Sequence, residues 1–300
     1  MNRDSVDWSG PMPAVVTPFD AAGAIDESAL RANIERQLAA GATGVLVGGC
    51  TGEFWSLTTS ERMQLFKTSA AIMNGRGTLL AGTGAVTVTE TVQLSHAAQE
   101  AGCDGALILP PYFIRLNDDE IVAHFRDVDA AVSIPIVLYN IPGNALNEIT
   151  PELAVRLAEL EHVVAIKESS GDWNNFYSTL LAVKDTLRVF CGPSSIFGVP
   201  AIAAGADGCI DCFPNVWLPG GLDIYHKAKA GELEAAAELQ ETGRRLTNLF
   251  TSGGRSLYPA TKAAMEFQGV AAGEPRAPLR PLLGPALEEL HDGLRELGIT

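Results

Sequence analysis

The stretch Val163-Val-Ala-Ile-Lys-Glu168 is a run of four apolar residues that ends in a lysine and a glutamate. A short, uninterrupted apolar run of this kind is typical of a strand that is buried on both faces, as in a parallel sheet. Burial at the tip of such a strand disfavours a charged ammonium group and lowers the pKa of the lysine. A neutral Lys167 amine could attack a carbonyl carbon, whereas the more common role of a strand-end lysine is to reach solvent or pair with an acid. The rest of the sequence decides between these roles.

Seven further apolar runs of the same kind recur along the chain, about one βα unit apart. They begin near residues 13, 44, 78, 105, 135, 187 and 208. Helical segments are predicted between them, with capping residues at their ends. They cover residues 25–40, 59–74, 89–101, 118–131, 150–160, 172–184 and 195–204. Eight strands that alternate with helices predict an α/β fold, a (β/α)8 TIM barrel over residues 1–216. A doubly wound open sheet fits less well because no G-x-G-x-x-G loop follows the first strand.

The chain continues beyond the eighth strand for longer than a single helix requires. Helices are predicted over residues 218–230, 232–250, 257–267 and 285–297. No stretch with the composition of a linker separates them from the barrel. We therefore expect residues 217–300 to form a C-terminal helical extension that packs on the barrel as one structural unit.

Composition excludes several classes of function. The formal net charge of −15 argues against nucleic acid and anionic membranes as partners. No apolar run is long enough to span a membrane, and the first ten residues lack the apolar core of a secretion signal. Cys209 and Cys212 have the C-x-x-C spacing of a zinc site, but the second half of such a site is missing. We expect reduced cysteines, a cytoplasmic protein and no metal or cofactor.

Catalytic groups of a barrel gather at the carboxyl ends of its strands. Lys167 ends one strand and Tyr139 ends the strand before it. The turn Gly49-Cys50-Thr51 follows another strand and is rich in backbone N–H groups that can hold a carboxylate. Each feature alone has a structural explanation, as a core tyrosine or a plain turn. Together they predict a Schiff base between Lys167 and a 2-oxo acid of the pyruvate type, with Tyr139 moving protons.

Three motifs carry a resemblance to a known family. Gly48-Gly-Cys-Thr-Gly-Glu53, Tyr139-Asn-Ile-Pro142 and Ile166-Lys-Glu168 resemble the dihydrodipicolinate synthase / N-acetylneuraminate lyase family, and the likeness extends over essentially the whole chain. These are class I, lysine-dependent aldolase-type lyases. The resemblance implies a barrel, a homotetramer built as a dimer of dimers and a Schiff base on Lys167. It also implies Tyr139 as proton shuttle and the Cys50–Thr51 turn as carboxylate seat.

Three positions depart from the pattern of the synthase. Cys50 replaces a threonine of the turn, Phe113 replaces a tyrosine that reaches across the subunit interface, and Asn144 replaces an arginine that binds the second substrate. The loop over residues 49–55 instead resembles that of sugar-acid dehydratases in the family. We expect aldol cleavage, dehydration or deamination of a sugar-acid-like 2-oxo acid. The alternatives are a true 4-hydroxy-tetrahydrodipicolinate synthase, which condenses pyruvate with aspartate semialdehyde, and a non-catalytic barrel that binds a 2-oxo acid.

Further residues at the strand ends are candidates for substrate contact. Asp211 follows the eighth strand, where it could bind a substrate hydroxyl or amine, take part in proton transfer, or serve as a solvated loop acid or helix cap. Gly192 and Ile210 lie at the same level of the predicted barrel, and Ser169, Ser194 and Asn215 are additional candidates.

Overall fold

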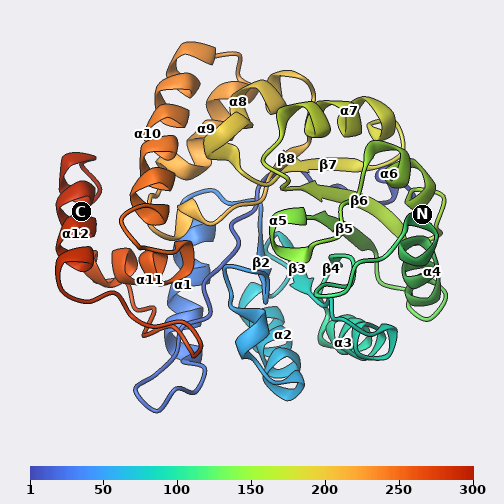
Figure 1. Cartoon of the computed structure of the whole chain (residues 1–300), viewed down its shortest axis with the longest axis horizontal. Helices are drawn as coiled ribbons and strands as arrows, with labels where there is room; N and C mark the ends of the chain where they lie inside the picture. The colour runs from blue at the N-terminus through green and yellow to red at the C-terminus, as the bar shows by residue number, and fades with distance from the viewer.

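Eight parallel strands form one sheet in the computed structural model, which describes residues 1–300 (Figure 1). Their order is β1-β8-β7-β6-β5-β4-β3-β2, and a bridge between Ala14 and Leu46 links the two ends of the sheet. The strands are β1 (Gly10–Pro11), β2 (Gly44–Val47), β3 (Thr78–Gly82), β4 (Gly105–Ile108), β5 (Ile136–Asn140), β6 (Val163–Glu168), β7 (Arg188–Cys191) and β8 (Gly208–Cys209). The prediction of a TIM barrel is confirmed.

Helices between the strands surround the barrel and match the predicted segments to within a few residues (Figure 1). They are α1 (Glu27–Ala39), α2 (Thr59–Met73), α3 (Val88–Ala101), α4 (Asp118–Asp129), α6 (Pro151–Leu157), α7 (Trp173–Val183) and α8 (Ser194–Ala203). Local chemistry explains these boundaries, because side chains of Asp26, Thr87 and Thr150 accept hydrogen bonds from first-turn N–H groups. The short helix α5 (Pro142–Ala145) was not predicted.

The first strand differs from the prediction that it begins near residue 13. The regular strand is β1, three residues earlier, and the chain then continues between β8 and β2 with a few backbone hydrogen bonds to each. Ala14 N donates to Asp211 O at 2.8 Å, and Leu46 N donates to Pro13 O at 2.9 Å. Pro11 and Pro13 have no N–H group, so a continuous ladder cannot form here.

Two hydrophobic cores hold the barrel. Side chains that fill its interior include Met12, Leu46, Val137 and Phe190. A larger core lies between the strands and the surrounding helices, and it takes the alternate residues of the same strands, such as Leu138 and Ile166. This alternation follows from the two-residue period of a strand, and it decides which residues point toward the barrel axis.

The C-terminal helices form a layer against one side of the barrel (left of Figure 1). They are α9 (Gly220–Lys229), α10 (Leu233–Thr251), α11 (Leu257–Phe267) and α12 (Pro285–Glu296). Their core includes Leu246, Phe250 and Leu290, and it also takes Val16 and Phe213 from the barrel. None of the helices combines the length and apolar character that crossing a membrane requires.

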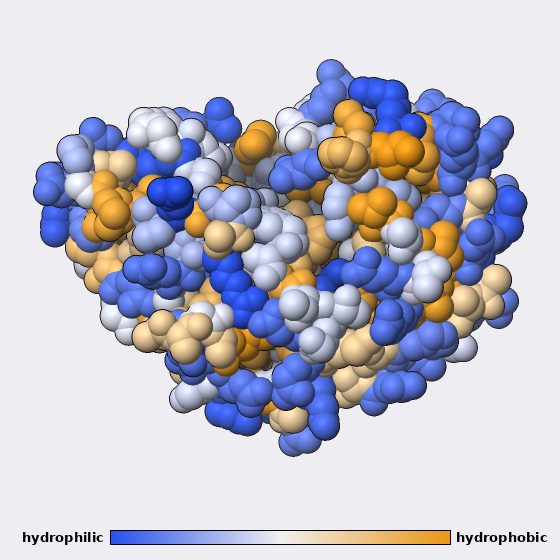
Figure 2. Space-filling view, turned by 60° about the horizontal axis from the view of Figure 1, so that its bottom comes forward, coloured by the Kyte–Doolittle hydropathy of each residue, from blue (hydrophilic) through white to orange (hydrophobic).

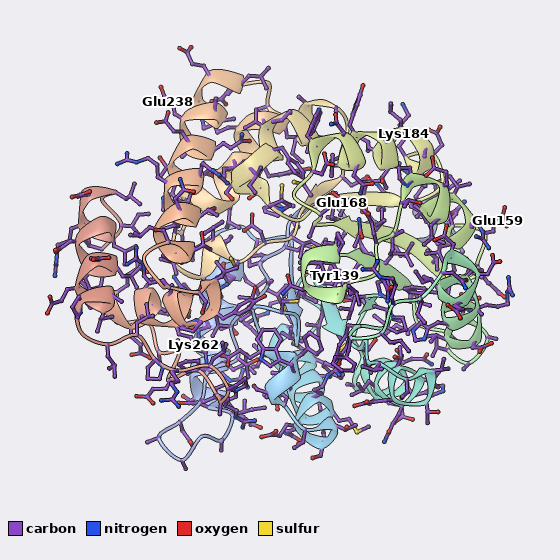
Figure 3. All side chains as sticks on the ribbon, in the orientation of Figure 1. Tyr139, Glu159, Glu168, Lys184, Glu238 and Lys262 are labelled. Atoms are coloured by element: carbon purple, nitrogen blue, oxygen red, sulfur yellow. The ribbon has the colours of Figure 1, made fainter.

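Hydrophilic residues dominate the face of the molecule in Figure 2, and hydrophobic side chains occur there in small groups. This distribution agrees with the net charge of −15. The side chains of Glu159, Lys184 and Glu238 are exposed on the outside of the molecule, whereas the side chain of Lys262, on α11, is buried (Figure 3).

A buried ion pair connects the extension to the barrel. Lys262 Nζ of α11 lies 2.8 Å from Glu53 Oε1 in the loop after β2, and the side chains are 2% and 0% exposed. Lys262 Nζ also donates to Glu274 O at 3.1 Å and sits 4.0 Å from the centroid of the Phe19 ring. These contacts compensate for the loss of water around the two charges.

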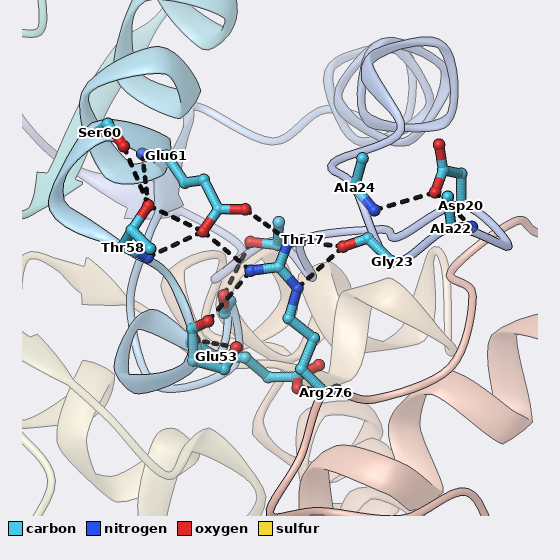
Figure 4. Close-up of polar contacts among 12 residues, drawn as sticks. Thr17, Asp20, Ala22, Gly23, Ala24, Glu53, Thr58, Ser60, Glu61 and Arg276 are labelled. Carbon is cyan, nitrogen blue, oxygen red and sulfur yellow. Dashed lines mark hydrogen bonds and ion pairs between the residues drawn. The ribbon is translucent and has the colours of Figure 1, made fainter.

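Arg276 strengthens the same connection (Figure 4). Its backbone N–H donates to Glu53 Oε2 at 3.0 Å, and its guanidinium group binds both carboxylate oxygens of Glu61 at 2.6 and 3.0 Å. The guanidinium also donates to Gly23 O, so the segment before α12 is held to the loops after β1 and β2. The hydrogen bonds from Arg276 lower the pKa of the Glu61 carboxyl to about 2.

Replacing Lys262 with methionine would leave Glu53 as a buried, unpaired charge. We expect the free energy of unfolding to fall by about 3–5 kcal/mol, measured as a shift of the urea midpoint. The matched control is Lys227→Met, which breaks the partly exposed pair between Lys227 and Glu232, whose charged atoms lie 2.6 Å apart. Solvent screens that pair, so its loss should change the midpoint little. Equal shifts in the two variants would contradict the role given to the Glu53–Lys262 pair.

Candidate active site

Lys167 and Tyr139 are paired residues on adjacent strands. In the β5–β6 register their Cα atoms are partners, so both side chains point into the barrel at the same level. The ammonium nitrogen of Lys167 lies 4.3 Å from the centroid of the Tyr139 ring, and the residues are 5% and 4% exposed. Figure 3 shows Tyr139 at the centre of the barrel end. The structure therefore brings the two principal predicted residues together.

Burial changes the proton affinity of both groups. It lowers the pKa of Lys167, against the opposing effect of the nearby Cys50 and Asp211 side chains. Lys167 forms no ion pair. Burial also raises the pKa of Tyr139 well above its ordinary value, so its phenol stays protonated. The arrangement provides an amine that loses its proton easily beside a hydroxyl that keeps its proton.

The turn after β2 supplies unpaired hydrogen-bond donors. The backbone N–H groups of Cys50 and Thr51 and the hydroxyl of Thr51 make no hydrogen bond within the chain. The Tyr139 hydroxyl donates to Cys50 Sγ at 3.8 Å. Thr17 Oγ1 donates to Gly52 O at 2.8 Å and fixes the turn from below. Three free donors in one rigid turn are suited to holding an anionic group.

The turn after β2 can lie close to β3 because β3 has a glycine, Gly82, at the point of contact. A Cβ atom at Gly82 of β3 would lie 2.1 Å from Gly48 O, a distance that no side chain tolerates. Gly48 itself has a φ of 62°, in the left-handed region that glycine adopts without strain. The glycines therefore set the depth of the Cys50–Thr51 turn.

Neighbouring residues hold the ends of β5 and β6. Asn140 Nδ2 donates to Glu168 Oε1 at 2.9 Å, and Asn140 Oδ1 accepts from Ile149 N at 2.9 Å. Glu168 Oε1 also accepts from Ser170 N at 2.9 Å. Asn140 and Glu168 follow Tyr139 and Lys167 directly, so their hydrogen bonds keep the two inward side chains in position.

A cavity of about 190 Å³ opens over these groups. Seven of the predicted site residues line it, from five different strand ends: Cys50, Thr51, Tyr139, Lys167, Gly192, Ile210 and Asp211. Ser169, one of the additional candidates, lines it as well.

Asp211 is fixed by two hydrogen bonds at the wall of this cavity. Its Oδ1 accepts from Phe213 N at 3.0 Å, and its Oδ2 accepts from the hydroxyl of Ser194. Burial raises the pKa of the Asp211 carboxyl, while these donors and Lys167 act in the opposite direction. Ser194 thus contacts Asp211 without lining the cavity. The side chain of Asn215 is buried elsewhere and binds the backbone of Ala14 and Val16.

Three predicted residues lie outside the cavity. Gly49 borders a much smaller space behind the turn, together with Cys50 and Tyr139. Asn144 is exposed on α5, where its side chain contacts the Tyr258 hydroxyl. Phe113 is 92% exposed on the loop after β4 and reaches no part of the cavity of its own chain.

Sequence reasoning missed the residues that the C-terminal extension adds to the wall. Thr247 and Thr251 of α10 and Tyr258 of α11 line the cavity beside Lys167. Tyr258 contacts the Cys50 thiol, and its ring lies 4.9 Å from that of Trp55. The helices were predicted, but no local signal shows which helix face meets the barrel mouth.

Other cavities and side-chain clusters lack a free reactive group or a set of metal ligands. A larger cavity of about 540 Å³ lies between α11 and α12, but its lysine, Lys262, is already paired with Glu53. No group of three or more histidine, cysteine, aspartate or glutamate side chains is placed to bind a metal ion. Cys209 packs in the core around the barrel and Cys212 in the core of the extension, so the C-x-x-C spacing does not bring the thiols into one site.

Comparison with known proteins agrees with this geometry. A 4-hydroxy-tetrahydrodipicolinate synthase of Hyphomonas neptunium is 36% identical over 278 residues, 91% of this chain and 92% of that protein. YagE, a prophage protein of the dihydrodipicolinic acid synthase family from E. coli K12 solved in complex with pyruvate, is 26% identical with a TM-score of 0.93 over 98% of this chain and 100% of YagE. Dihydrodipicolinate synthase from Acinetobacter baumannii, complexed with pyruvate, is 29% identical with a TM-score of 0.90 over 97% of this chain and 99% of that protein.

The model of the dihydrodipicolinate synthetase family matches residues 7–297, nearly the whole chain. Members of this family are class I lyases that need no cofactor beyond the covalent Schiff base of their own lysine. The chain therefore belongs to the dihydrodipicolinate synthetase family and is a Schiff-base lyase.

Proposed function

We propose that Lys167 forms the Schiff base and that the substrate is a sugar-acid-like 2-oxo acid, which the enzyme cleaves or from which it removes water or ammonia. The observation that carries this proposal is the pairing of Lys167 with Tyr139 on adjacent strands beneath one cavity. A lysine with a lowered pKa and no ion pair is the nucleophile that this chemistry requires.

The first step joins the Lys167 amine to C2 of the 2-oxo acid. The amine attacks the carbonyl carbon and gives a carbinolamine, which loses its hydroxyl group as water when a proton is supplied. Tyr139 can supply that proton because burial keeps its phenol protonated. The C1 carboxylate meanwhile accepts hydrogen bonds from the free N–H groups of Cys50 and Thr51 and from the Thr51 hydroxyl.

The second step uses the resulting iminium as an electron sink. Electrons of the C3–C4 bond, or of a C3–H bond, flow toward the iminium nitrogen and give an enamine. In aldol cleavage the C3–C4 bond breaks, the C4 hydroxyl gives its proton to the Tyr139 phenolate left by the first step, and C4 departs as a carbonyl compound. In dehydration or deamination the same phenolate takes the C3 proton and returns it to the C4 hydroxyl or amine, which departs as water or ammonia. The groups around Lys167 support both outcomes, so the substrate determines which bond breaks.

A true 4-hydroxy-tetrahydrodipicolinate synthase is the second candidate, because curated relatives carry that name. Two observations weigh against it. Asn144, at the position where the synthase pattern has an arginine, is exposed outside the cavity. The lining of the cavity contains no arginine to hold the carboxylate of aspartate semialdehyde.

We also infer that the enzyme is a cytoplasmic homotetramer. All five cysteines are free and buried, which suits a reducing compartment. Phe113, Ile114 and Leu146 are exposed near the carboxyl ends of the strands, and Asn147 holds their loops together through hydrogen bonds to Pro111 O and Ile114 O. An exposed apolar group in an ordered loop is typical of an interface between subunits.

Sodium borohydride should trap pyruvate on the wild-type enzyme as a single irreversible adduct, visible by intact mass spectrometry. Lys167→Ala should give no adduct, because the nitrogen that forms the iminium is gone. Lys184→Ala, which removes an exposed lysine of the outer surface, serves as the control and should be trapped like wild type. Failure of the wild type to form an adduct, or an equal adduct on Lys167→Ala, would refute the assignment.

Turnover separates the two candidate activities. We expect release of pyruvate or ammonia from one or more 2-oxo-3-deoxy sugar acids or related imino acids. Pyruvate with aspartate semialdehyde should be consumed far more slowly. Efficient condensation of that pair would instead establish the synthase.

Adduct formation should depend on pH in a direction set by Lys167. The neutral amine attacks, so the initial trapping rate should rise with pH and level off above the lowered pKa of Lys167. Free Nα-acetyl-lysine, measured with pyruvate from about pH 6 to about pH 11, should level off only above about pH 10. Coincident profiles for enzyme and free amine would show that burial does not activate Lys167.

Phe113→Asp should weaken the proposed subunit contact, because it places a charge where an apolar side chain would be buried. Light scattering should give four chains for the wild type and fewer for the variant at the same concentration. Asp118→Asn, an exposed substitution on the neighbouring α4, is the control and should leave the mass unchanged. A monomeric wild type would exclude the tetramer.

A further inference from the structure

The charges around the cavity are unevenly distributed. Among the residues that line it, Lys167 is the one basic side chain and Asp211 the one acidic side chain. Two other buried cations lie near the strand ends but do not line the cavity. Arg62 donates to the carbonyl oxygens of Gly82 and Gly84 behind the turn, and Lys262 is paired with Glu53.

Formation of the Schiff base engages Lys167, the one basic side chain that lines the cavity. The iminium on Lys167 carries a single positive charge, which balances the C1 carboxylate of a bound 2-oxo acid. A second carboxylate on the substrate would meet no positive group and would lie in the same cavity as Asp211. Like charges in such a confined space repel, so the cavity disfavours dicarboxylic 2-oxo acids.

Asp211 retains free acceptor capacity toward the cavity. Each of its oxygens accepts one hydrogen bond from the protein, from Phe213 N and from the Ser194 hydroxyl. A carboxylate has about four acceptor positions, so two are left for a ligand. The bonds from Phe213 and Ser194 also fix the orientation of the carboxylate, which favours a ligand donor at a defined place.

Four further residues of the cavity lining, Ser195, Thr247, Thr251 and Tyr258, form what we call the distal wall, which is neutral and rich in hydroxyl groups. The hydroxyls of Ser195 and Thr247 are hydrogen-bonded to each other at 2.9 Å. Hydroxyl groups both donate and accept hydrogen bonds, so they suit substrate hydroxyls as well as an amine. They offer no charge that could neutralise a second anion.

We propose that Asp211 selects the substrate of this site: it binds a hydroxyl or ammonium group on the distal carbons of a 2-oxo monocarboxylic acid and rejects a second carboxylate. The proposal rests on the Schiff-base function assigned to Lys167. It assigns Asp211 a role in specificity, separate from formation of the covalent bond.

Three five-carbon acids that differ only at C5 test this selection. They are 2-oxopentanoate, 5-hydroxy-2-oxopentanoate and 2-oxoglutarate, which end in a methyl, a hydroxyl and a carboxylate group. The readout is the concentration that gives half-maximal borohydride adduct by intact mass. We expect the wild type to require at least about tenfold more 2-oxoglutarate than hydroxy acid, with the methyl compound between them. Equal trapping of 2-oxoglutarate and the hydroxy acid by the wild type would overturn the proposal without any variant.

Asp211→Asn keeps the shape of the side chain and removes its charge. We expect the preference for the hydroxy acid over 2-oxoglutarate to fall to within about threefold. Asp185→Asn, which removes an exposed acid after α7, is the matched control and should keep the wild-type preference. Asp211→Ser provides a second, smaller replacement if the asparagine variant does not fold. An unchanged preference in a folded Asp211 variant would overturn the proposal, whereas loss of pyruvate trapping by the wild type would overturn the proposed function itself.

Discussion

The buried ion pair between Glu53 and Lys262 is the interaction on which the arrangement of this site depends. Glu53 closes the turn that presents Cys50 and Thr51, while Lys262 lies on α11, one helical turn after Tyr258. One pair of charges therefore sets the carboxylate seat and the distal wall relative to each other. A buried pair is costly to desolvate, so its value here lies in fixing one geometry rather than in adding stability beyond an apolar pair.

Two kinds of buried cation lie at this end of the barrel: Arg62 and Lys262 stabilise the structure, whereas Lys167 reacts. Arg62 donates to two backbone carbonyl oxygens and Lys262 is paired with the Glu53 carboxylate, which opposes the lowering of the Lys262 pKa by burial. Lys167 is buried without an ion pair, so burial lowers its pKa and the proton is held less tightly. The chemical difference between two buried lysines thus follows from their neighbours rather than from their degree of burial.

The sequence was sufficient to predict the barrel and the centre of the site, because both depend on local patterns. Each buried strand is a short apolar run, and six of the seven predicted helices between the strands begin at a capping side chain, so their order determines which residues share the reactive face. Lys167 and Tyr139 could be paired for this reason. The first strand was misplaced because two prolines interrupt its ladder. Thr247, Thr251 and Tyr258 could not be assigned, because their position depends on how distant helices dock. The exposure of Phe113 and Asn144 likewise depends on the conformation of the segments that follow β4 and β5.

Residues of the distal wall come largely from a different part of the chain than the residues that form the covalent bond. Lys167 and Tyr139 belong to central strands, whereas Thr247, Thr251 and Tyr258 belong to the helices that follow the barrel. Substitutions in those helices can reshape what the enzyme accepts without disturbing how it reacts. Activity on new substrates can therefore evolve through substitutions in the C-terminal helices, while the strands of the barrel preserve the reaction.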